Sequence, residues 1–428
     1  MQAMNRMLTL RSICIMLSFL LLSRQAVADV IREIRFEGNE ITEPAVLLQE
    51  MVINTGDEVD VSRIEKSVQH IMDLGLFEQV NYRLDEDTPD SGKILTISVI
   101  ERYYLIPLPT AKLNDNNELE YGVKLRWNNI WGLNHRLNWK ILDKGSSRGV
   151  NEFSIKMDYN MPRLFFSRYQ LTLYTETVVE VDEDPVFGAQ RQRASSYGID
   201  LLKWLNEDGV SSGLFAGGGI AYSRKEILAL EAGGPPNETQ NAVVYSARIG
   251  YDDVHEYLYN RGGIFVQYRI DFSSGEASNG DTTFTRHEFD FRNLHVYSKE
   301  PPVNFNYHIV IGQSNNDVLG DKAFTLGGNT NLRGYKTDTY RGNAVLRMNL
   351  EYLSKIGESS LLRKVYFLDT GDTPDRLADV RLSSFKSSVG AGIRWKLRQF
   401  VDLDLRLDAA YAFETDDFHI ALGTHGTF

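Results

Sequence analysis

Hydrophobic and polar residues alternate with a period of two through most of the chain after residue 102. The segments 264–272 and 401–408 show the pattern clearly, with apolar residues at every second position and mostly polar or charged residues between them. The apolar positions of the second segment are Val401, Leu403, Leu405 and Leu407. Such alternation predicts strands with one apolar face. Long strands with a charged opposite face favour a membrane barrel with a wet lumen over a soluble sandwich.

Sixteen segments of this kind follow one another between turn-forming residues. They begin near Ile106, Glu118, Asn134, Asn151, Tyr169, Ser195, Gly213, Asn241, Gly263, Thr283, Asn304, Gly342, Leu362, Phe385, Val401 and Phe418. An even number of strands is typical of single-chain bacterial barrels. We therefore expect residues 102–428 to form a transmembrane antiparallel β-barrel, with a long insertion between the eleventh and twelfth strands.

The last of these strands alternates as far as the final residue. One of its faces carries Phe418, Ile420, Leu422, Thr424, Gly426 and Phe428. A final aromatic residue suits a strand that closes a barrel in lipid, because the ring then lies at the membrane interface. This ending predicts the outer membrane of a Gram-negative bacterium, with outer-membrane lipids as partners of the chain.

Residues 29–101 follow a different pattern, which predicts a small α+β domain. A strand from Val30 to Phe36 precedes a helix capped by Thr42, and a second helix follows Asp60 and stops at Gly75. The second helix carries apolar residues at helical spacing. Two alternating strands, around residues 80–84 and 95–99, complete the order strand, helix, helix, strand, strand.

Residues 1–28 have the features of a secretory signal peptide. Arg6 and Arg11 precede an apolar run, and Ala26-Val27-Ala28 supplies a small-x-small cleavage site. A retained membrane anchor is the alternative, but the run is too short to span a bilayer as a helix. Cleavage would remove the only cysteine, Cys14, and leave 43 basic against 58 acidic side chains, a net charge of −15. That balance argues against a nucleic-acid partner.

Several motifs in the small domain carry a family resemblance. The segments 31–42, 72–80 and 97–101, together with Gly56, resemble a POTRA domain, the periplasmic module that precedes BamA-like barrels. The resemblance covers the whole of residues 29–101 and implies a single POTRA domain that receives unfolded or nascent polypeptides. BamA, TamA and two-partner-secretion transporters carry more POTRA domains, so their individual partners are not transferred to this chain.

The insertion after the eleventh strand contains the run 324–335, which ends in Leu332-Arg333-Gly334-Tyr335. Its glycines alone could suggest a phosphate loop, but no Lys-Ser/Thr pair follows them and no βαβ pattern surrounds them. The run closely resembles the Arg-Gly-Tyr/Phe motif in the sixth extracellular loop of the BamA, TamA and two-partner-secretion superfamily. The resemblance implies that residues 321–341 fold back into the barrel. The segment 390–395 also resembles the Gly-x-Gly-x-Arg-Trp run of that superfamily, without the turn that usually follows.

The phase of two strands indicates partners for the arginine of this motif. Alternation on the twelfth strand places Glu351 in the lumen, and Asp369 belongs to a run that resembles the family's Phe-x-Asp-x-Gly signature. We therefore expect the Arg333 guanidinium to be clamped by Glu351 and Asp369. Gly334 would bend the loop backbone and Tyr335 would pack against the wall. The alternative is that Arg333 is a solvated loop residue.

The seam between the first and last strands carries residues that weaken strand pairing. The first strand is expected to follow Pro107 and Pro109, which cannot donate ladder hydrogen bonds, and the last carries Gly423 and Gly426 before Phe428. Such a seam could open sideways as a lateral gate. The alternative is that the two prolines merely end the linker from the small domain.

The sequence shows no convincing catalytic constellation. Its eight histidines include no metal-binding His-x-x-x-His spacing, and His70 is expected at a surface or capping position. The run 145–149 matches a nucleophile elbow in letters, but it joins two expected strands instead of a strand and a helix. We expect no enzymatic activity, no cofactor and no metal site.

Three functions are compatible with these features. An insertase would template a client strand at the seam by β-augmentation. A translocator, such as a two-partner-secretion transporter of one exoprotein, would pass an unfolded polypeptide through the lumen. A passive outer-membrane pore would use the small domain only for docking. The family resemblance favours the first two functions.

Overall fold

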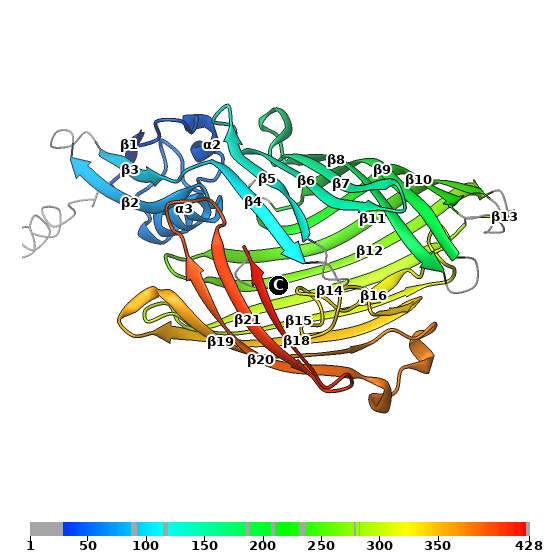
Figure 1. The fold of residues 1–428 in the computed structure, drawn as a ribbon. Helices are drawn as coiled ribbons and strands as arrows, with labels where there is room; N and C mark the ends of the chain where they lie inside the picture. Colours follow the sequence, from blue (N-terminus) through cyan, green and yellow to red (C-terminus); the bar gives the residue numbers. More distant parts are fainter. Residues whose placement is uncertain are drawn as a thin grey trace, which may run out of the picture.

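The computed structural model describes residues 29–86, 92–113, 119–184, 188–206, 210–230, 237–277, 280–281 and 283–424. The expected signal peptide and two of the seam residues, Gly426 and Phe428, lie outside the described residues. The chain folds into a small N-terminal domain placed at one end of a large barrel of tilted strands (Figure 1). We call the barrel opening next to this domain the near mouth and the opposite opening the far mouth.

The N-terminal domain has the expected order of elements. These are β1 (Ile31–Glu37), α2 (Pro44–Leu48), α3 (Val61–Asp73), β2 (Phe77–Glu86) and β3 (Lys93–Glu101). The sheet order is β1-β3-β2, with β3 parallel to β1 and antiparallel to β2. Its core includes the buried side chains of Ile31, Leu47, Ile64, Ile71, Leu95 and Ile97. None of the helices among the described residues is long and apolar enough to span a membrane.

The two helices differ in how well their starts were predicted. Helix α3 follows Asp60 as expected. The Asp60 side chain accepts hydrogen bonds from the Ser62 hydroxyl and from two backbone amides of the first turn, and these bonds lower the pKa of its carboxyl. Gly75 follows the end of α3 with a φ of 72°. The prediction that Thr42 caps the first helix is wrong, since the N-cap is Glu43. Thr42 is buried and instead donates its backbone N–H to Glu101 Oε1 at 2.7 Å.

His70 lies on the buried side of α3, so its predicted surface or capping position is wrong. Only 6% of the side chain is exposed. Burial lowers the pKa of the imidazole, because the charged form loses hydration. The sequence could not reveal this burial. The barrel covers that side of the helix, and helical spacing indicates only which residues face the core of the domain itself.

Sixteen long antiparallel strands form the barrel, and all sixteen predicted strands are present. They are β4 (Leu105–Leu113), β5 (Leu119–Ile130), β6 (His135–Ser147), β7 (Val150–Met161), β8 (Tyr169–Asp184), β9 (Gly188–Trp204), β10 (Gly213–Ala229), β11 (Glu238–Glu256), β12 (Arg261–Ala277), β14 (Thr285–Ser298), β15 (Val303–Ser314), β18 (Ala344–Ile356), β19 (Ser359–Asp372), β20 (Lys386–Lys396), β21 (Asp404–Ala412) and β22 (Asp417–Gly423). The two-residue β13 (Gly280–Asp281) extends the hairpin between β12 and β14. The insertion between β15 and β18 contains a separate hairpin of β16 (Phe324–Leu326) and β17 (Tyr340–Gly342). Short 3-10 turns lie at Leu164–Phe166, Leu377–Asp379 and Leu382–Ser384.

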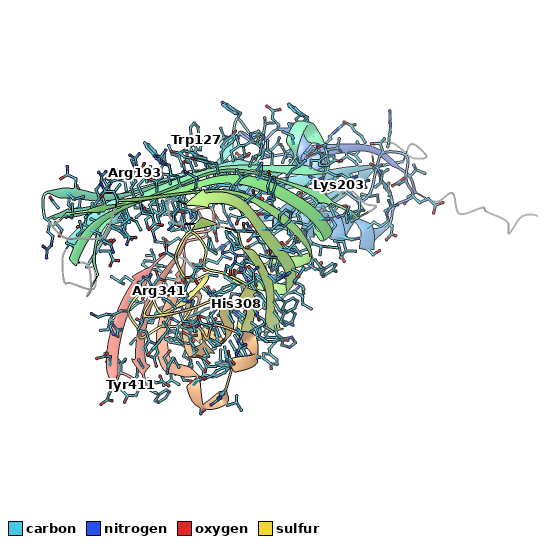
Figure 2. The ribbon with its side chains drawn as sticks, turned by 90° about the vertical axis from the view of Figure 1, so that its right-hand side faces the viewer. Trp127, Arg193, Lys203, His308, Arg341 and Tyr411 are labelled. Carbon is cyan, nitrogen blue, oxygen red and sulfur yellow. The ribbon has the colours of Figure 1, made fainter. Side chains whose placement is uncertain are left out.

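The two faces of the wall follow the predicted alternation over most of its length. Trp127 of β5 and Tyr411 of β21 stand on the outer surface of the wall (Figure 2), with 40% and 37% of the two residues exposed. On the lumen side, Asp271 is buried and paired with Arg269 and Arg286. An apolar exterior and a charge-paired interior are what a barrel in lipid requires.

The start of the fifteenth strand departs from the prediction. The strand begins at Asp404, three residues after the predicted Val401, and both Val401 and Leu403 are buried. Val401 packs into the core of the N-terminal domain together with Tyr104. The prediction that Val401 begins the apolar face of the strand is therefore wrong. The turn between β20 and β21 bends to meet the N-terminal domain and does not continue the lipid-facing surface.

The N-terminal domain is docked on the near mouth by several hydrogen bonds. Asp73 of α3 accepts from the Glu256 N–H at 2.8 Å and pairs with His255 at 2.7 Å, both at the end of β11. The Glu43 N–H donates to the Gly132 carbonyl at 3.0 Å, in the turn between β5 and β6. These contacts involve backbone as well as side chains, so they define one orientation of the domain on the barrel.

Candidate functional site

The insertion between β15 and β18 folds back into the barrel (Figure 1). Its hairpin and motif form one buried apolar cluster with three strands of the wall. The cluster contains Phe324, Leu326, Leu332 and Tyr335 from the loop and Val310, Val345 and Ala412 from the wall. The loop is thus held in the lumen by burial of apolar surface as well as by the charged contacts described next.

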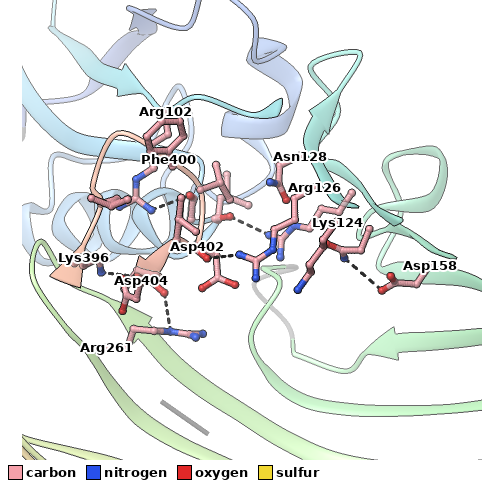
Figure 3. Close-up of a pocket in the computed structure, with 18 of the residues that line it drawn as sticks. Arg102, Lys124, Arg126, Asn128, Asp158, Arg261, Lys396, Phe400, Asp402 and Asp404 are labelled. Atoms are coloured by element: carbon pink, nitrogen blue, oxygen red, sulfur yellow. Dashed lines mark hydrogen bonds and ion pairs between the residues drawn. The ribbon is translucent and has the colours of Figure 1, made fainter. Parts of the chain in front are cut away.

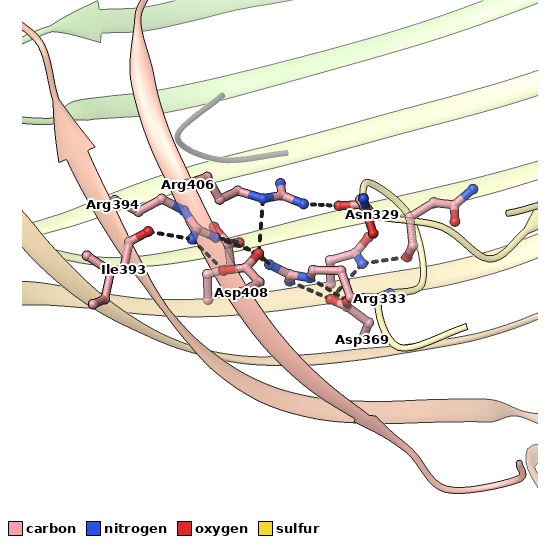
Figure 4. Close-up of polar contacts among 10 residues, drawn as sticks. Asn329, Arg333, Asp369, Ile393, Arg394, Arg406 and Asp408 are labelled. Carbon is pink, nitrogen blue, oxygen red and sulfur yellow. Dashed lines mark hydrogen bonds and ion pairs between the residues drawn. The ribbon is translucent and has the colours of Figure 1, made fainter. Parts of the chain in front are cut away.

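Arg333 lies at the centre of this site and is 4% exposed (Figure 4). Its Nε and Nη2 donate to Asp369 Oδ2 and Oδ1 at 2.6 and 2.7 Å, and its Nη1 donates to Glu351 Oε1 at 2.7 Å. The Arg333 backbone N–H also donates to Asp369, at 3.1 Å. Asn349 Nδ2 donates both to Asp369 Oδ1, at 2.8 Å, and to the Asn331 carbonyl, at 2.7 Å. The structure therefore brings together Arg333 and the two carboxylates that the sequence pointed to.

Three further buried charges, which sequence reasoning did not assign to the site, extend this network. Arg394 donates to both carboxylate oxygens of Asp408, and its Nη2 lies 3.5 Å from Glu351 Oε1. Arg406 Nε lies 3.0 Å from Asp408 Oδ2, and Arg333 Nη1 lies 3.6 Å from the same oxygen. Three guanidinium groups thus face three carboxylates. Pairing of this kind offsets the cost of burying each charge.

The sequence indicated the positions of these residues only in part. Arg394 stood in the run that resembles the family's Gly-x-Gly-x-Arg-Trp signature, and Asp408 stood on the polar face of its strand. Their pairing depends on the register of β20 against β21, in which Arg394 lies opposite Arg406. Period-two alternation tells which face a residue occupies, but it does not give register between strands.

Two glycines of β20 make room for the network. A Cβ on Gly392 would lie 2.0 Å from Asp408 Oδ1, and one on Gly390 would lie 2.2 Å from the Phe367 ring. Phe367 in turn lies under the guanidinium, with Arg333 Cζ 3.6 Å from the ring centroid, a cation–π contact. Any larger residue at either glycine would displace a group that touches Arg333 or its partners.

Gly334 and Tyr335, which follow Arg333, have the conformation and the wall contact expected of them. Gly334 has a φ of 93°, where a side chain would be strained, and a Cβ there would also lie 3.4 Å from Ala410 and Ala412. The Tyr335 hydroxyl donates to the Ser387 carbonyl at 2.8 Å and contacts the carboxylate of Glu414. The bend at Gly334 lets Arg333 and Tyr335 reach different parts of the wall.

The network joins four successive strands. Glu351 comes from β18, Asp369 from β19, Arg394 from β20 and Asp408 from β21, and Arg333 of the loop touches three of them. The described part of β22 contributes no ion pair to this network. The wall is therefore charge-paired up to β21, and the last strand lies outside that pairing.

The seam between the last strand, β22, and the first strand, β4, lies next to this network. The strand order makes β22 and β4 hydrogen-bonded neighbours, although the ladder positions recorded for the described residues join β22 to β21 and β4 to β5. Pro107 and Pro109 lie inside β4, so the predictions that the strand follows them and that they end the linker are both wrong. Gly423 is the last residue of β22. Arg126 of β5 reaches across, with its Nη2 3.3 Å from the Thr424 hydroxyl.

A polar cavity of about 420 Å³ lies inside the near mouth, between the N-terminal domain and the wall (Figure 3). Basic residues predominate in its lining and include Arg102, Lys124, Arg126, Arg136, Arg261 and Lys396. Arg102 Nη1 and Arg136 Nη2 donate to the carbonyls of Gly75 and Leu74, at 3.1 and 3.0 Å. These carbonyls end α3, where the helix dipole favours cations. The arginines therefore hold the end of α3 over this vestibule.

Comparison with known families identifies the chain. Residues 30–102 match the POTRA family, described as a surface antigen variable number repeat, and residues 115–424 match the Omp85 superfamily domain. The chain belongs to the Omp85 superfamily. Its fold is thus a POTRA domain followed by a 16-stranded barrel of the BamA-like kind, as the sequence predicted. Members of this superfamily are assembly and transport proteins rather than enzymes.

Solved structures of other Omp85 proteins share this fold. CdiB from Escherichia coli is 14% identical, with a TM-score of 0.62 over 93% of this chain and 75% of that one. CdiB from Acinetobacter baumannii is 11% identical, with a TM-score of 0.60 over 92% and 73%. BamA from Haemophilus ducreyi lacking POTRA domains 1–3 is 13% identical, with a TM-score of 0.53 over 92% and 84%. No curated protein matches the sequence.

Proposed function

We propose that this Omp85 protein lies in the outer membrane of a Gram-negative bacterium, with its POTRA domain in the periplasm, and inserts outer-membrane polypeptides through the seam between β4 and β22. The observation that carries the proposal is the contrast between two neighbouring regions of wall. The strands β18 to β21 are tied by buried ion pairs, whereas the described part of β22 adds no ion pair to that network, and its recorded ladder partners all lie on β21.

The composition of β4 supports a seam that can open. Pro107 and Pro109 stand two residues apart, so their nitrogens face the same edge of the strand, and neither nitrogen can donate a hydrogen bond. An edge with few donors pairs weakly with its neighbour. A client strand could then add to β22 by β-augmentation, in which backbone hydrogen bonds supply the affinity.

A cross-linking experiment tests this role. The variant Leu108→Cys/Ala421→Cys joins lumen-side positions of β4 and β22 through a short thiol cross-linker, and Cys14 is the only native cysteine in the sequence. The readout is the folding rate of a urea-unfolded eight-stranded outer-membrane barrel in lipid vesicles that contain the full protein. We expect the protein to accelerate folding of this probe and the cross-link to abolish the acceleration.

The matched control is Leu108→Cys/Lys124→Cys, which joins two residues already opposite each other in the β4–β5 ladder. This cross-link should leave the acceleration unchanged. If the seam cross-link also leaves it unchanged, the seam is not the route of insertion.

Translocation through the lumen is the second candidate, and the vestibule favours it, since a charged cavity at the near mouth is a place where an unfolded chain can enter. Passage would require both the POTRA domain and the Arg333 loop to move. Export of a single secreted client that survives the seam cross-link would support a translocator of the two-partner-secretion type. Large steady conductance without any polypeptide client would support a passive pore.

A further inference from the structure

A second, mostly apolar cavity lies on the outside of the junction between the POTRA domain and the barrel. It has a volume of about 220 Å³ and is formed by the end of α2 and by two turns at the near mouth, those between β5 and β6 and between β7 and β8. Its apolar lining includes Val46, Trp131, Leu133, Met161, Phe165 and Phe166. We call it the junction groove.

The aromatic residues of the junction groove are held in strained conformations. Trp131, Phe165 and Phe166 have φ values of 56°, 49° and 57°, in the left-handed region that bulky residues avoid. Their side chains are nevertheless 73%, 88% and 53% exposed. Backbone strain of this kind persists where the surroundings impose it, and it gathers at functional sites. Here it turns three large apolar rings outward.

The position of the groove indicates what these rings meet. The turns that carry them continue strands whose outer faces are apolar, with Trp127 and Trp139 40% and 41% exposed further along the wall. Figure 2 shows Trp127 on this outer surface. The groove is therefore continuous with the lipid-facing surface and lies at its near-mouth edge, the level at which tryptophan is enriched in membrane proteins.

The groove is a built feature, because the surfaces that form it are fixed to one another. Beneath it, Glu50 pairs with Arg163 at 2.7 Å, with 3% and 8% of the two side chains exposed. The turn carrying Trp131 lies so close to the POTRA domain that a Cβ on Gly132 would be 2.2 Å from the Ile41 carbonyl oxygen. The charges of Glu50 and Arg163 are thus paired in the floor, although Arg163 Nε and Gln49 Oε1 have no hydrogen-bond partner among the described residues, and apolar groups face outward.

We propose that the junction groove binds the acyl chain of a phospholipid from the periplasmic leaflet and that the bound lipid supports the docked POTRA domain. This inference rests on the membrane placement proposed above and not on the insertase role. Most of the lining is apolar and the Arg163 charge is paired with Glu50, so binding should depend mainly on the acyl chain and show little preference among phospholipid headgroups.

Tryptophan fluorescence of the full protein in phospholipid nanodiscs tests the proposal. The probe is phosphatidylcholine brominated on the acyl carbons nearest the headgroup, and the signal of Trp131 is the difference between the wild type and Trp131→Phe. We expect bromolipid to quench Trp131 strongly and dissolved iodide to quench it weakly. The double variant Phe165→Ser/Phe166→Ser should reverse this order, because water then enters the groove.

Lipid retention gives a second readout. After extraction in mild detergent, the wild type should retain one phospholipid more than Phe165→Ser/Phe166→Ser, counted by native mass spectrometry. The matched control is Tyr297→Ser, which removes an aromatic residue that is 66% exposed at the near-mouth end of β14 and outside the groove. It should retain as much lipid as the wild type.

The outcomes separate this inference from the proposed membrane placement. If Trp131 is quenched by iodide and not by bromolipid while Trp127 and Trp139 are quenched by bromolipid, the groove is wet and the inference is wrong. If none of the three is quenched by bromolipid, the membrane placement itself fails. Protection of Trp131 only when two copies share a nanodisc would mean that a second copy of the chain covers the groove, which would also overturn the proposal.

Discussion

At the scale of single residues, Arg333 decides whether the loop stays in the lumen. Its side chain is 5% exposed, so the charges of Glu351 and Asp369 replace the water that it lost. We expect Arg333→Ala to destabilise the folded barrel by about 3–5 kcal/mol, because it leaves Asp369 buried without the ion pair recorded for it and Glu351 with only the longer contact to Arg394. Arg333→Lys should recover part of the loss, since an ammonium keeps the charge but cannot bind Asp369 bidentately. Both effects are measured by urea unfolding, with the gel mobility of unheated samples as the readout of the folded fraction.

The control for this prediction is Arg341→Ala, which removes an exposed arginine from the same loop. We expect its unfolding midpoint to stay within experimental error of the wild type. Equal midpoints for the wild type and Arg333→Ala would mean that the loop is held by its apolar cluster alone.

Glycine positions under the network allow a second test at this scale. In Gly392→Ala the new methyl group would lie 2.0 Å from Asp408 Oδ1, so the carboxylate must shift away from Arg394. Overpacking of this kind typically costs about 1–3 kcal/mol. Gly423→Ala is the control, because its Cβ would meet nothing closer than 3.7 Å. Urea unfolding should separate the two variants, and identical midpoints would show that the wall relaxes around Gly392.

At the scale of elements, the strands were predictable because lipid and a wet lumen impose opposite chemistry on alternate residues. The same logic placed Glu351 and Asp369 inward, and the structure has them there. It failed where the POTRA domain and the barrel meet. Thr42 bonds to Glu101, and Val401 packs in the domain core, so neither follows the local pattern. Contacts between distant segments override the local periodicity of apolar residues, and the sequence of one segment alone does not reveal such contacts.

Helix α3 carries one such hidden contact, and it makes the helix sensitive to pH. Burial lowers the pKa of His70 below its ordinary value of 6.5, although the carboxylates of Glu50 and Asp73 oppose the shift. The unfolded state therefore binds a proton before the folded state does, and stability falls as the pH drops below about 6.5. We expect α3 amides to exchange hydrogen faster at about pH 5.5 than at about pH 7.5, after correction for intrinsic rates.

The variant His70→Leu provides the comparison. Its side chain fits a buried position and cannot titrate, so the pH dependence of exchange in α3 should shrink. Persistence of the same dependence in His70→Leu would assign it to groups other than His70.

At the scale of the whole molecule, the lumen is obstructed twice. The Arg333 loop fills it from the far mouth, and the POTRA domain covers the vestibule at the near mouth. The two obstructions are held by different contacts, the first by the six-charge network and the second by backbone and ionic contacts to near-mouth turns. Substitutions can therefore address one obstruction without touching the contacts of the other.

The buried pair of Glu50 and Arg163 is the contact through which to release the POTRA domain alone. Glu50 Oε1 accepts from Arg163 at 2.7 Å and from the Ser211 hydroxyl at 3.0 Å, and Oε2 accepts from the Ser211 N–H at 3.1 Å. Glu50→Gln leaves Arg163 buried without a counter-charge, which destabilises the docked state by about 3–5 kcal/mol.

Spin labels at Lys66→Cys and Lys299→Cys should then report a broader distance distribution between domain and barrel, and single-channel conductance should rise as the vestibule opens. Glu43→Gln, an exposed change on the same side of the domain, should alter neither measurement. A narrow, unshifted distribution in Glu50→Gln would show that the backbone contacts at Gly132 and Glu256 suffice to hold the POTRA domain in place.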